Sequence, residues 1–198
     1  MVIFHWQGQP LIFHTVNSIA RFQEVEKIIL VVDDTEKVAR LIATCPAFPK
    51  HKVTICRGDA SRHRSIKAGI DLISQGIVNL LSTSQSQKIA TSGDGIYFPE
   101  AEADVPDLVM IHDGARPLMP SKDLTNDLFK AAESHGAAGF YLPLVSTLLE
   151  IDPLNGDVKD CVKRAKYVAS ETPQAFTWNV IRDAYLKVGF CETWLLSL

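Results

Sequence analysis

The sequence predicts an α/β fold in which helices cover both faces of a mostly parallel sheet, with an added pair of strands around a turn. Strand-like apolar runs alternate with helical patterns along most of the 198 residues, and this alternation is typical of parallel sheets. Two strands around a tight turn replace the alternation at 144–170. The length suits one hydrophobic core, so we expect a single domain over 1–198.

The first half of the chain shows the alternation most clearly. Pro10 is suited to the first position of a helix. Residues 28–32 read Ile-Ile-Leu-Val-Val, the continuous apolar run of a buried parallel strand. Asp34 follows and can cap the next helix. A second strand at 53–56 and a helix at 61–74 continue the pattern.

A long polar segment, 76–106, interrupts this order. It is rich in Ser, Gln, Gly and acidic residues. Loops of this length are uncommon in compact domains, so we predict a flexible surface insertion. The alternation then resumes with strands at 108–111 and 139–142, a helix at 121–134 between them, and a final helix at 177–187.

The segment 144–170 reads as two strands around Pro153-Leu154-Asn155-Gly156-Asp157, because Asn-Gly favours tight turns. We predict that this pair forms a hairpin, which the family resemblance described below identifies as a protruding arm. Ligands in Rossmann-like sheets bind at the carboxyl ends of the strands. The loops after Val32, Cys56, Ile111 and Leu142 are therefore where chemistry is expected.

Composition and charge exclude several classes of protein. The formal net charge of −3 gives no whole-molecule basic field for nucleic acid. No apolar stretch approaches the roughly 20 residues of a membrane-spanning helix, and no signal peptide is visible. The four cysteines lack C-x-x-C spacing, so we expect reduced thiols in a cytosolic protein.

The loop after the second strand is strongly basic. It reads Arg57-Gly58-Asp59-Ala60-Ser61-Arg62-His63-Arg64-Ser65 and opens a helix. A helix N-terminus presents free N–H groups and a partial positive charge, so a phosphate or a base edge is a natural ligand. A solvated basic loop would have the same composition, and the residues alone leave both interpretations open.

The loop after 108–111 reads His112-Asp113-Gly114-Ala115-Arg116-Pro117. An Asp at a strand end is a common ligand for a hard cation that bridges phosphates, and Arg116 can hold a second phosphate through two N–H groups. The alternative for Asp113 is a cap of the following turn. His112 is either a general base or, as we favour, a hydrogen-bonded structural histidine.

A third cluster comprises Thr147, Arg164 and the run Thr172-Pro173-Gln174. Thr147 and Arg164 are expected on the two limbs of the arm. A hydroxyl and a guanidinium brought together suit a phosphate. A β-surface threonine and an exposed arginine would give the same pattern, so the residues alone do not decide.

These motifs together resemble one family. The segments 58–69, 111–117, 136–147 and 164–176 occur in the order and spacing of the 2-C-methyl-D-erythritol 4-phosphate cytidylyltransferases and their animal relatives, the D-ribitol-5-phosphate cytidylyltransferases. The resemblance covers the chain from about Gly8 onward and is closer to the animal relatives. It implies a Rossmann-like fold of the nucleotide-diphospho-sugar transferase type.

The resemblance implies roles for individual residues. Ser65 and the backbone of Gly58, Asp59 and Ala60 would contact cytosine and ribose, although Asp59 stands where the family usually has glycine. Asp113 would hold the Mg²⁺ that bridges the triphosphate of CTP. The catalytic contacts to the polyol phosphate would come from Arg116, Thr147 and Arg164.

The resemblance also implies a homodimer, because the family's arm reaches into the neighbouring subunit. Thr147 and Arg164 would then serve the partner's site, and 144–170 would be a dimerisation arm. On a single subunit this arm would expose apolar residues such as Leu148, Leu149 and Ile151, which agrees with a dimer.

The implied reaction joins CTP to a polyol phosphate and releases pyrophosphate. The leading acceptor is D-ribitol 5-phosphate, whose product, CDP-ribitol, would serve the extension of protein O-mannosyl glycans. One alternative is the methylerythritol phosphate reaction of isoprenoid synthesis. Another is an inactive truncated form or dimerisation partner, because the family's first strand, glycine-rich loop and terminal lysine have no counterpart here. On that ground we expect this chain to have low activity and low stability.

Overall fold

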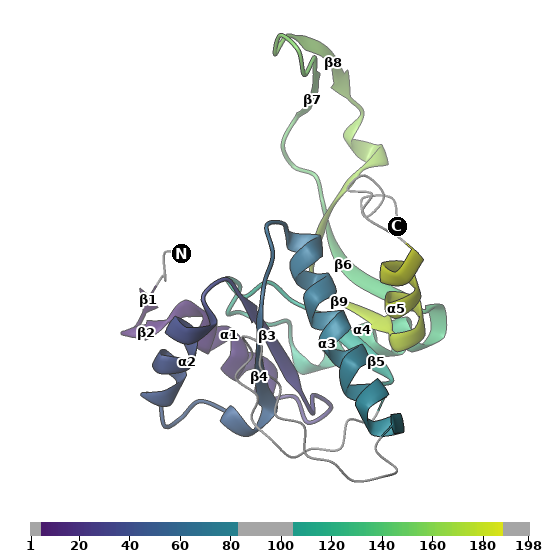
Figure 1. The fold of residues 1–198 in the computed structure, drawn as a ribbon. Helices are drawn as coiled ribbons and strands as arrows, with labels where there is room; N and C mark the ends of the chain where they lie inside the picture. The colour runs from purple at the N-terminus through teal and green to yellow at the C-terminus, as the bar shows by residue number, and fades with distance from the viewer. Residues whose placement is uncertain (1–4, 83–104, 188–198) are drawn as a thin grey trace.

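The structure is a computed structural model that describes residues 5–82 and 105–187. Figure 1 shows a layered body from which one β-hairpin projects. The helices are α1 (Leu11–Ala20), α2 (Thr35–Ala43), α3 (Arg62–Ser82), α4 (Lys122–His135) and α5 (Trp178–Lys187), with short 3₁₀ turns at Lys50–Lys52 and Arg164–Lys166. The strands are β1 (His5–Trp6), β2 (Gln9–Pro10), β3 (Ile28–Val32), β4 (Val53–Arg57), β5 (Leu108–Ile111), β6 (Ala137–Pro143), β7 (Leu148–Ile151), β8 (Val158–Val162) and β9 (Val168–Thr177).

The parallel pair β3–β4 is covered on both faces. Leu30 and Val32 lie in a core shared with α1 and α2. The alternate residues Ile29 and Val31 face α3, since a Cβ added at Gly69 of α3 would lie 3.4 Å from the Val31 side chain. The buried residues of the core are Phe13, Val16, Leu30, Val32, Val38, Ile42, Phe48, Val53 and Ile55.

A second sheet has the strand order β5–β9–β6 and is also covered on both faces. Phe176 and Val109 pack with α3 and α5, whereas the adjacent residues Ala175 and Leu108 pack with α4. Successive residues of a strand point to opposite faces, so the helices lie on opposite sides of this sheet. The predicted α/β class, with helices on both faces, is confirmed.

Strand direction differs from the prediction in this second sheet. β9 pairs antiparallel with both β5 and β6, so the two predicted strands are parallel to each other with β9 between them. The physical reason is that the chain returns from the arm as a strand of ten residues and enters the sheet. The pattern analysis ended its strand pair at 170 and assigned no strand to 171–176.

The predicted helix starts are largely confirmed. The Asp34 side chain accepts a hydrogen bond from the Lys37 N–H at 2.9 Å and caps α2. Ser121 caps α4. Pro10, expected at the first position of a helix, instead lies one residue earlier, at the N-cap of α1 and the end of β2. Gly136 ends α4 with φ +85, a conformation that side chains other than glycine rarely adopt.

The boundary of the predicted insertion needs a correction. α3 continues through Ser82, so residues 76–82 are helical rather than part of the loop predicted at 76–106. The apolar spacing at Ile66, Ile70 and Ile73 continues as Ile77, which the pattern analysis had placed beyond the helix end. Residues 83–104 lie outside the part of the chain that the structure describes.

The arm is a hairpin of β7 and β8 that projects from the body (Figure 1). Its turn forms where the sequence predicted it. The N–H of Gly156 donates to the Asp152 carbonyl at 2.8 Å, and the N–H of Asp157 donates to Asn155 Oδ1 at 3.0 Å. Gly156 has φ +78, which explains the need for glycine there. The dimerisation role of this arm stays a prediction.

Cys45, Cys56 and Cys161 are free thiols, whereas Cys191 lies outside the described residues. Burial raises the pKa of the Cys56 thiol, and the nearby Asp71 carboxylate adds to this shift. Within 5–82 and 105–187, none of the helices has the length and apolar character needed to cross a membrane.

Candidate active site

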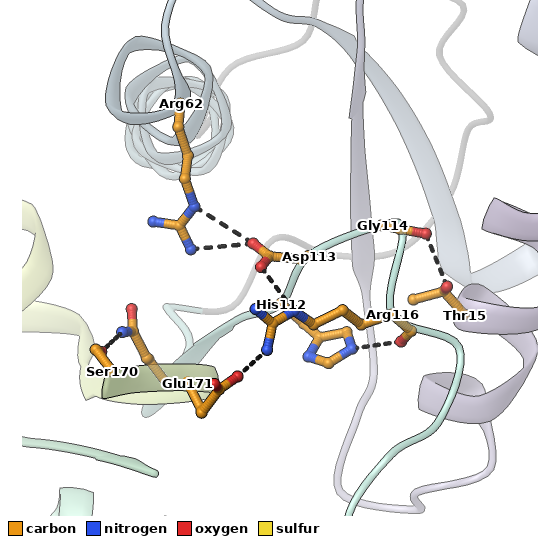
Figure 2. Close-up of polar contacts among 9 residues, drawn as sticks. Thr15, Arg62, His112, Asp113, Gly114, Arg116, Ser170 and Glu171 are labelled. Carbon is orange, nitrogen blue, oxygen red and sulfur yellow. Dashed lines mark hydrogen bonds and ion pairs between the residues drawn. The ribbon is translucent and has the colours of Figure 1, made fainter. Parts of the chain in front are cut away.

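Two loops that the sequence analysis singled out lie together at the carboxyl ends of β4 and β5 (Figure 2). Arg62, at the start of α3, donates from Nε and Nη2 to Asp113 Oδ1 at 3.3 and 3.2 Å. The two residues are 51 positions apart in sequence. The basic loop and the loop of Asp113 therefore meet through a direct contact.

The loop after β4 is ordered by Ser65. The Ser65 hydroxyl accepts a hydrogen bond from the Asp59 N–H at 3.0 Å and donates to the Asp59 carbonyl at 3.1 Å. Gly58 donates its N–H to the Val32 carbonyl at 2.7 Å. A Cβ at Gly58 would lie only 3.0 Å from Ser65 Oγ, so the close approach favours glycine. Gly58, Asp59, Ala60 and Ser65 thus form one compact turn.

Replacing Ser65 by Ala is expected to destabilise the fold by about 1–2 kcal/mol, because two hydrogen bonds to Asp59 are lost. Denaturant unfolding measures this change, and amide hydrogen exchange at Asp59 should accelerate. Ser74→Ala is the matched control, since Ser74 lies on the same helix and donates its hydroxyl to the Ile70 carbonyl at 3.0 Å, away from the loop. Equal stability of the two variants would contradict the role of Ser65 in the loop.

Asp113 lies between two guanidinium groups. Oδ1 accepts from Arg62, while Oδ2 forms an ion pair with Arg116 Nε at 3.2 Å. The Asp113 side chain is 34% exposed, so the carboxylate remains open to solvent. Arg116 and Arg62 are also about half exposed. An anionic ligand that approaches Asp113 therefore meets positive charge on two sides.

Mg²⁺ is the cofactor expected at Asp113. Mg²⁺ keeps several waters and binds through one or two carboxylates together with substrate phosphates. In the described ranges, no group of three or more His, Cys, Asp or Glu side chains is placed to hold a metal by itself. The Asp113 carboxylate, 34% exposed at a strand end, could supply one such ligand, and Mg²⁺ at this position stays a prediction.

The loop from His112 to Arg116 is fixed at several points. His112 Nε2 lies 2.8 Å from the Arg116 carbonyl, which supports the structural role favoured for this histidine. Thr15 of α1 donates its hydroxyl to the Gly114 carbonyl at 2.8 Å. Arg116 Nη1 donates to Glu171 Oε2 on β9. This hydrogen bond, together with the Glu171 and Asp113 charges, raises the pKa of Arg116 above its ordinary value.

Thr147 and Arg164 lie at the base of the arm. Thr147 precedes β7, and Arg164 follows β8 in the turn Arg164–Lys166. Arg164 Nη1 donates to the Val145 carbonyl, which ties the two limbs together. Both side chains are exposed. Among the described residues, no hydrogen bond or ion pair joins either of them to the Asp113 loop.

The sequence analysis did not predict the contacts of two residues, Arg62 and Glu171. Arg62 was noted only as part of a basic loop, and its pairing with Asp113 was not predicted. Glu171 was not singled out at all. The Arg62 contact depends on the packing of α3 beside the loop after β5. The Glu171 contact depends on strand β9, which pairs with the end of β5 at Ile111 and Gln174.

Comparisons with known proteins identify related sequences. Residues 3–82 and 98–194 match the family model described as IspD, 2-C-methyl-D-erythritol 4-phosphate cytidylyltransferase. The D-ribitol-5-phosphate cytidylyltransferase of Xenopus tropicalis is 33% identical over 91% of this chain and 38% of that protein. The 2-C-methyl-D-erythritol 4-phosphate cytidylyltransferase of Rhodopirellula baltica is 31% identical over 92% of this chain and 66% of its own length.

A solved structure shows the same fold. The 4-diphosphocytidyl-2C-methyl-D-erythritol synthase of Anaerococcus prevotii matches with a TM-score of 0.59 and 20% identity, over 92% of this chain and 66% of that one. The chain spans just over a third of the Xenopus protein's length. Because the family model matches most of the residues, the chain belongs to the IspD family of 2-C-methyl-D-erythritol 4-phosphate cytidylyltransferases.

Proposed function

We propose that this chain carries the cytidylyltransferase site of a protein that joins CTP to D-ribitol 5-phosphate, giving CDP-ribitol and pyrophosphate. The observation that carries the proposal is the convergence of the Arg62 and Arg116 guanidiniums on Asp113. The relatives named for ribitol phosphate match the chain at 28–33% identity. The product would serve the extension of O-mannosyl glycans.

The nucleotide would bind in the turn formed by Gly58, Asp59, Ala60 and Ser65, next to the N-terminus of α3. N–H groups and the partial positive charge at a helix N-terminus favour phosphate and polar base edges. Asp113 would hold Mg²⁺, which neutralises phosphate charge during the displacement at the α-phosphorus. The protein itself aligns two anionic reactants, as is general for phosphoryl transfer.

The acceptor phosphate would be held by Arg116 together with Thr147 and Arg164 of a second subunit. This assignment requires a homodimer, because Thr147 and Arg164 lie on the projecting arm (Figure 1). The arm has the exposed apolar residues that a partner subunit would cover, among them Leu149 and Ile151. Without the dimer, the proposed shared site for the acceptor phosphate would not form.

A second acceptor is 2-C-methyl-D-erythritol 4-phosphate, and two observations favour it. The matching family model bears that description, and the Rhodopirellula relative is 31% identical to the chain. Both acceptors are polyol phosphates, so the same arginines would serve either one.

The test measures pyrophosphate release from CTP, in the presence of Mg²⁺, with each acceptor in turn. We expect turnover with D-ribitol 5-phosphate to exceed turnover with 2-C-methyl-D-erythritol 4-phosphate. ATP, GTP and UTP serve as controls for the base. Faster turnover with the methylerythritol phosphate would replace the proposed acceptor. Failure to bind CTP, measured by calorimetry, would contradict the nucleotide site.

A further inference from the structure

We propose that Glu171 is a positioning residue that orients the Arg116 guanidinium toward the acceptor phosphate. The inference rests on the proposed function, in which Arg116 binds that phosphate. Glu171 does not touch the reactants in this proposal. It acts through Arg116, and it does so from a strand that the Asp113 loop does not belong to.

The course of β9 explains why Glu171 reaches Arg116. β5 and β9 pair antiparallel with Ile111 opposite Gln174, so the residues before Gln174 lie beside the loop that follows β5. The pairing of β9 with β6 shifts register between Gln174 and Ser170, and Glu171 lies in this irregular stretch. Figure 2 shows Glu171 on the side of Arg116 away from Arg62. Its side chain is 26% exposed, less than that of Arg116 at 46%.

Two carboxylates hold Arg116 at different nitrogens. Asp113 Oδ2 pairs with Nε, and Glu171 Oε2 accepts from Nη1. Two anchors on separate nitrogens restrict rotation of the guanidinium plane. A guanidinium has five N–H donors, so these contacts leave donors for a phosphate. Arg116 is thus oriented before the acceptor arrives, which lowers the entropic cost of binding it.

The two anchors differ in their other roles. In the proposed function Asp113 would also hold Mg²⁺, whereas Glu171 contacts Arg116 Nη1 from β9 and has no second role. Glu171 would therefore be the anchor of Arg116 that does not also serve the metal.

A purely structural ion pair would behave differently. Exposed Arg–Glu pairs contribute little to stability, and their loss leaves substrate affinities unchanged. The chain contains a matched example in Arg40 and Glu36 on α2, which pair at 3.0 Å on the surface. Glu36→Ala removes an ion pair of the same chemical type outside the candidate site and is the control.

The kinetic experiment compares Glu171→Ala, Glu171→Gln and Glu36→Ala with the unmodified chain. Glu171→Ala is expected to raise the KM for D-ribitol 5-phosphate about tenfold, with the KM for CTP changed less than about twofold. Glu171→Gln should recover part of the loss, because its amide oxygen still accepts a hydrogen bond. Glu36→Ala should match the unmodified chain.

A second measurement does not depend on turnover. The Arg116 Nη–H signals in ¹⁵N NMR, assigned by their loss in Arg116→Lys, should show faster solvent exchange in Glu171→Ala than in the unmodified chain, because Glu171 accepts from Nη1. An unchanged signal would overturn the inference even if the protein were inactive. An unchanged acceptor KM in an active protein would overturn it too. Absence of CTP binding in the unmodified chain would instead reject the proposed function.

Discussion

In an active full-length protein that carries this chain, Asp113→Asn is expected to lower the rate of CTP-dependent pyrophosphate release by about 10²–10³-fold, or roughly 2–4 kcal/mol of transition-state stabilisation. The amide is neutral and binds Mg²⁺ far less strongly than a carboxylate does. The substitution also leaves Arg62 and Arg116 without the negative charge that lies between them. Their guanidiniums would then reorient.

The fold should survive this substitution. Asp113 follows β5, outside the buried core, and its side chain is 34% exposed. Thermal unfolding checks that point, and a titration of the rate with Mg²⁺ checks the metal. Asp71→Asn is the matched control, because Asp71 pairs with Lys67 on the surface of α3. A variant with an unchanged rate at low Mg²⁺ would remove Asp113 from the mechanism.

Most of the fold could be predicted because local patterns agree with the tertiary structure. The run at 28–32 is β3 with the predicted boundaries, and the cap at Asp34 forms as expected. The turn of the arm forms at Asn155 and Gly156 because only a few residues tolerate its backbone. These features depend on residues close together in sequence, where propensity and periodicity are informative.

Strand β9 was not predicted, because its identity depends on distant neighbours. Its sequence, Val-Ala-Ser-Glu-Thr-Pro-Gln-Ala-Phe-Thr, mixes small, polar and proline residues that have low strand propensity. Pairing with β5 and β6 overrides this preference. The antiparallel direction follows from the route of the chain through the arm, which periodicity does not record.

The candidate site was predicted in part for the same reason. Asp113 and Arg116 were identified because strand-end loops carry ligands in α/β sheets. The contact between Arg62 and Asp113 requires the packing of α3 beside the β5 loop, and Glu171 requires the register of β9. Sequence reasoning thus found the charged residues of each loop, and the structure shows which charges meet.

The second large effect is expected at the arm. Leu149 and Ile151 lie on one face of β7 and are 53% and 56% exposed. A two-stranded hairpin that projects alone is marginally stable in water. Replacing both residues by Lys should weaken the proposed dimer by at least about 100-fold, because two apolar contacts would be exchanged for like charges. Sedimentation velocity at micromolar concentration should then show a monomer.

The control is Leu124→Lys, which changes an equally exposed apolar residue on α4 and should leave the dimer intact. The arm variant also tests whether the site is shared. The nucleotide turn and Asp113 belong to one chain, whereas Thr147 and Arg164 would reach the neighbouring one. The monomeric variant should therefore still bind CTP and lose acceptor turnover. A monomer with full turnover would place Thr147 and Arg164 outside the reaction, and an unmodified chain that sediments as a monomer would exclude the dimer.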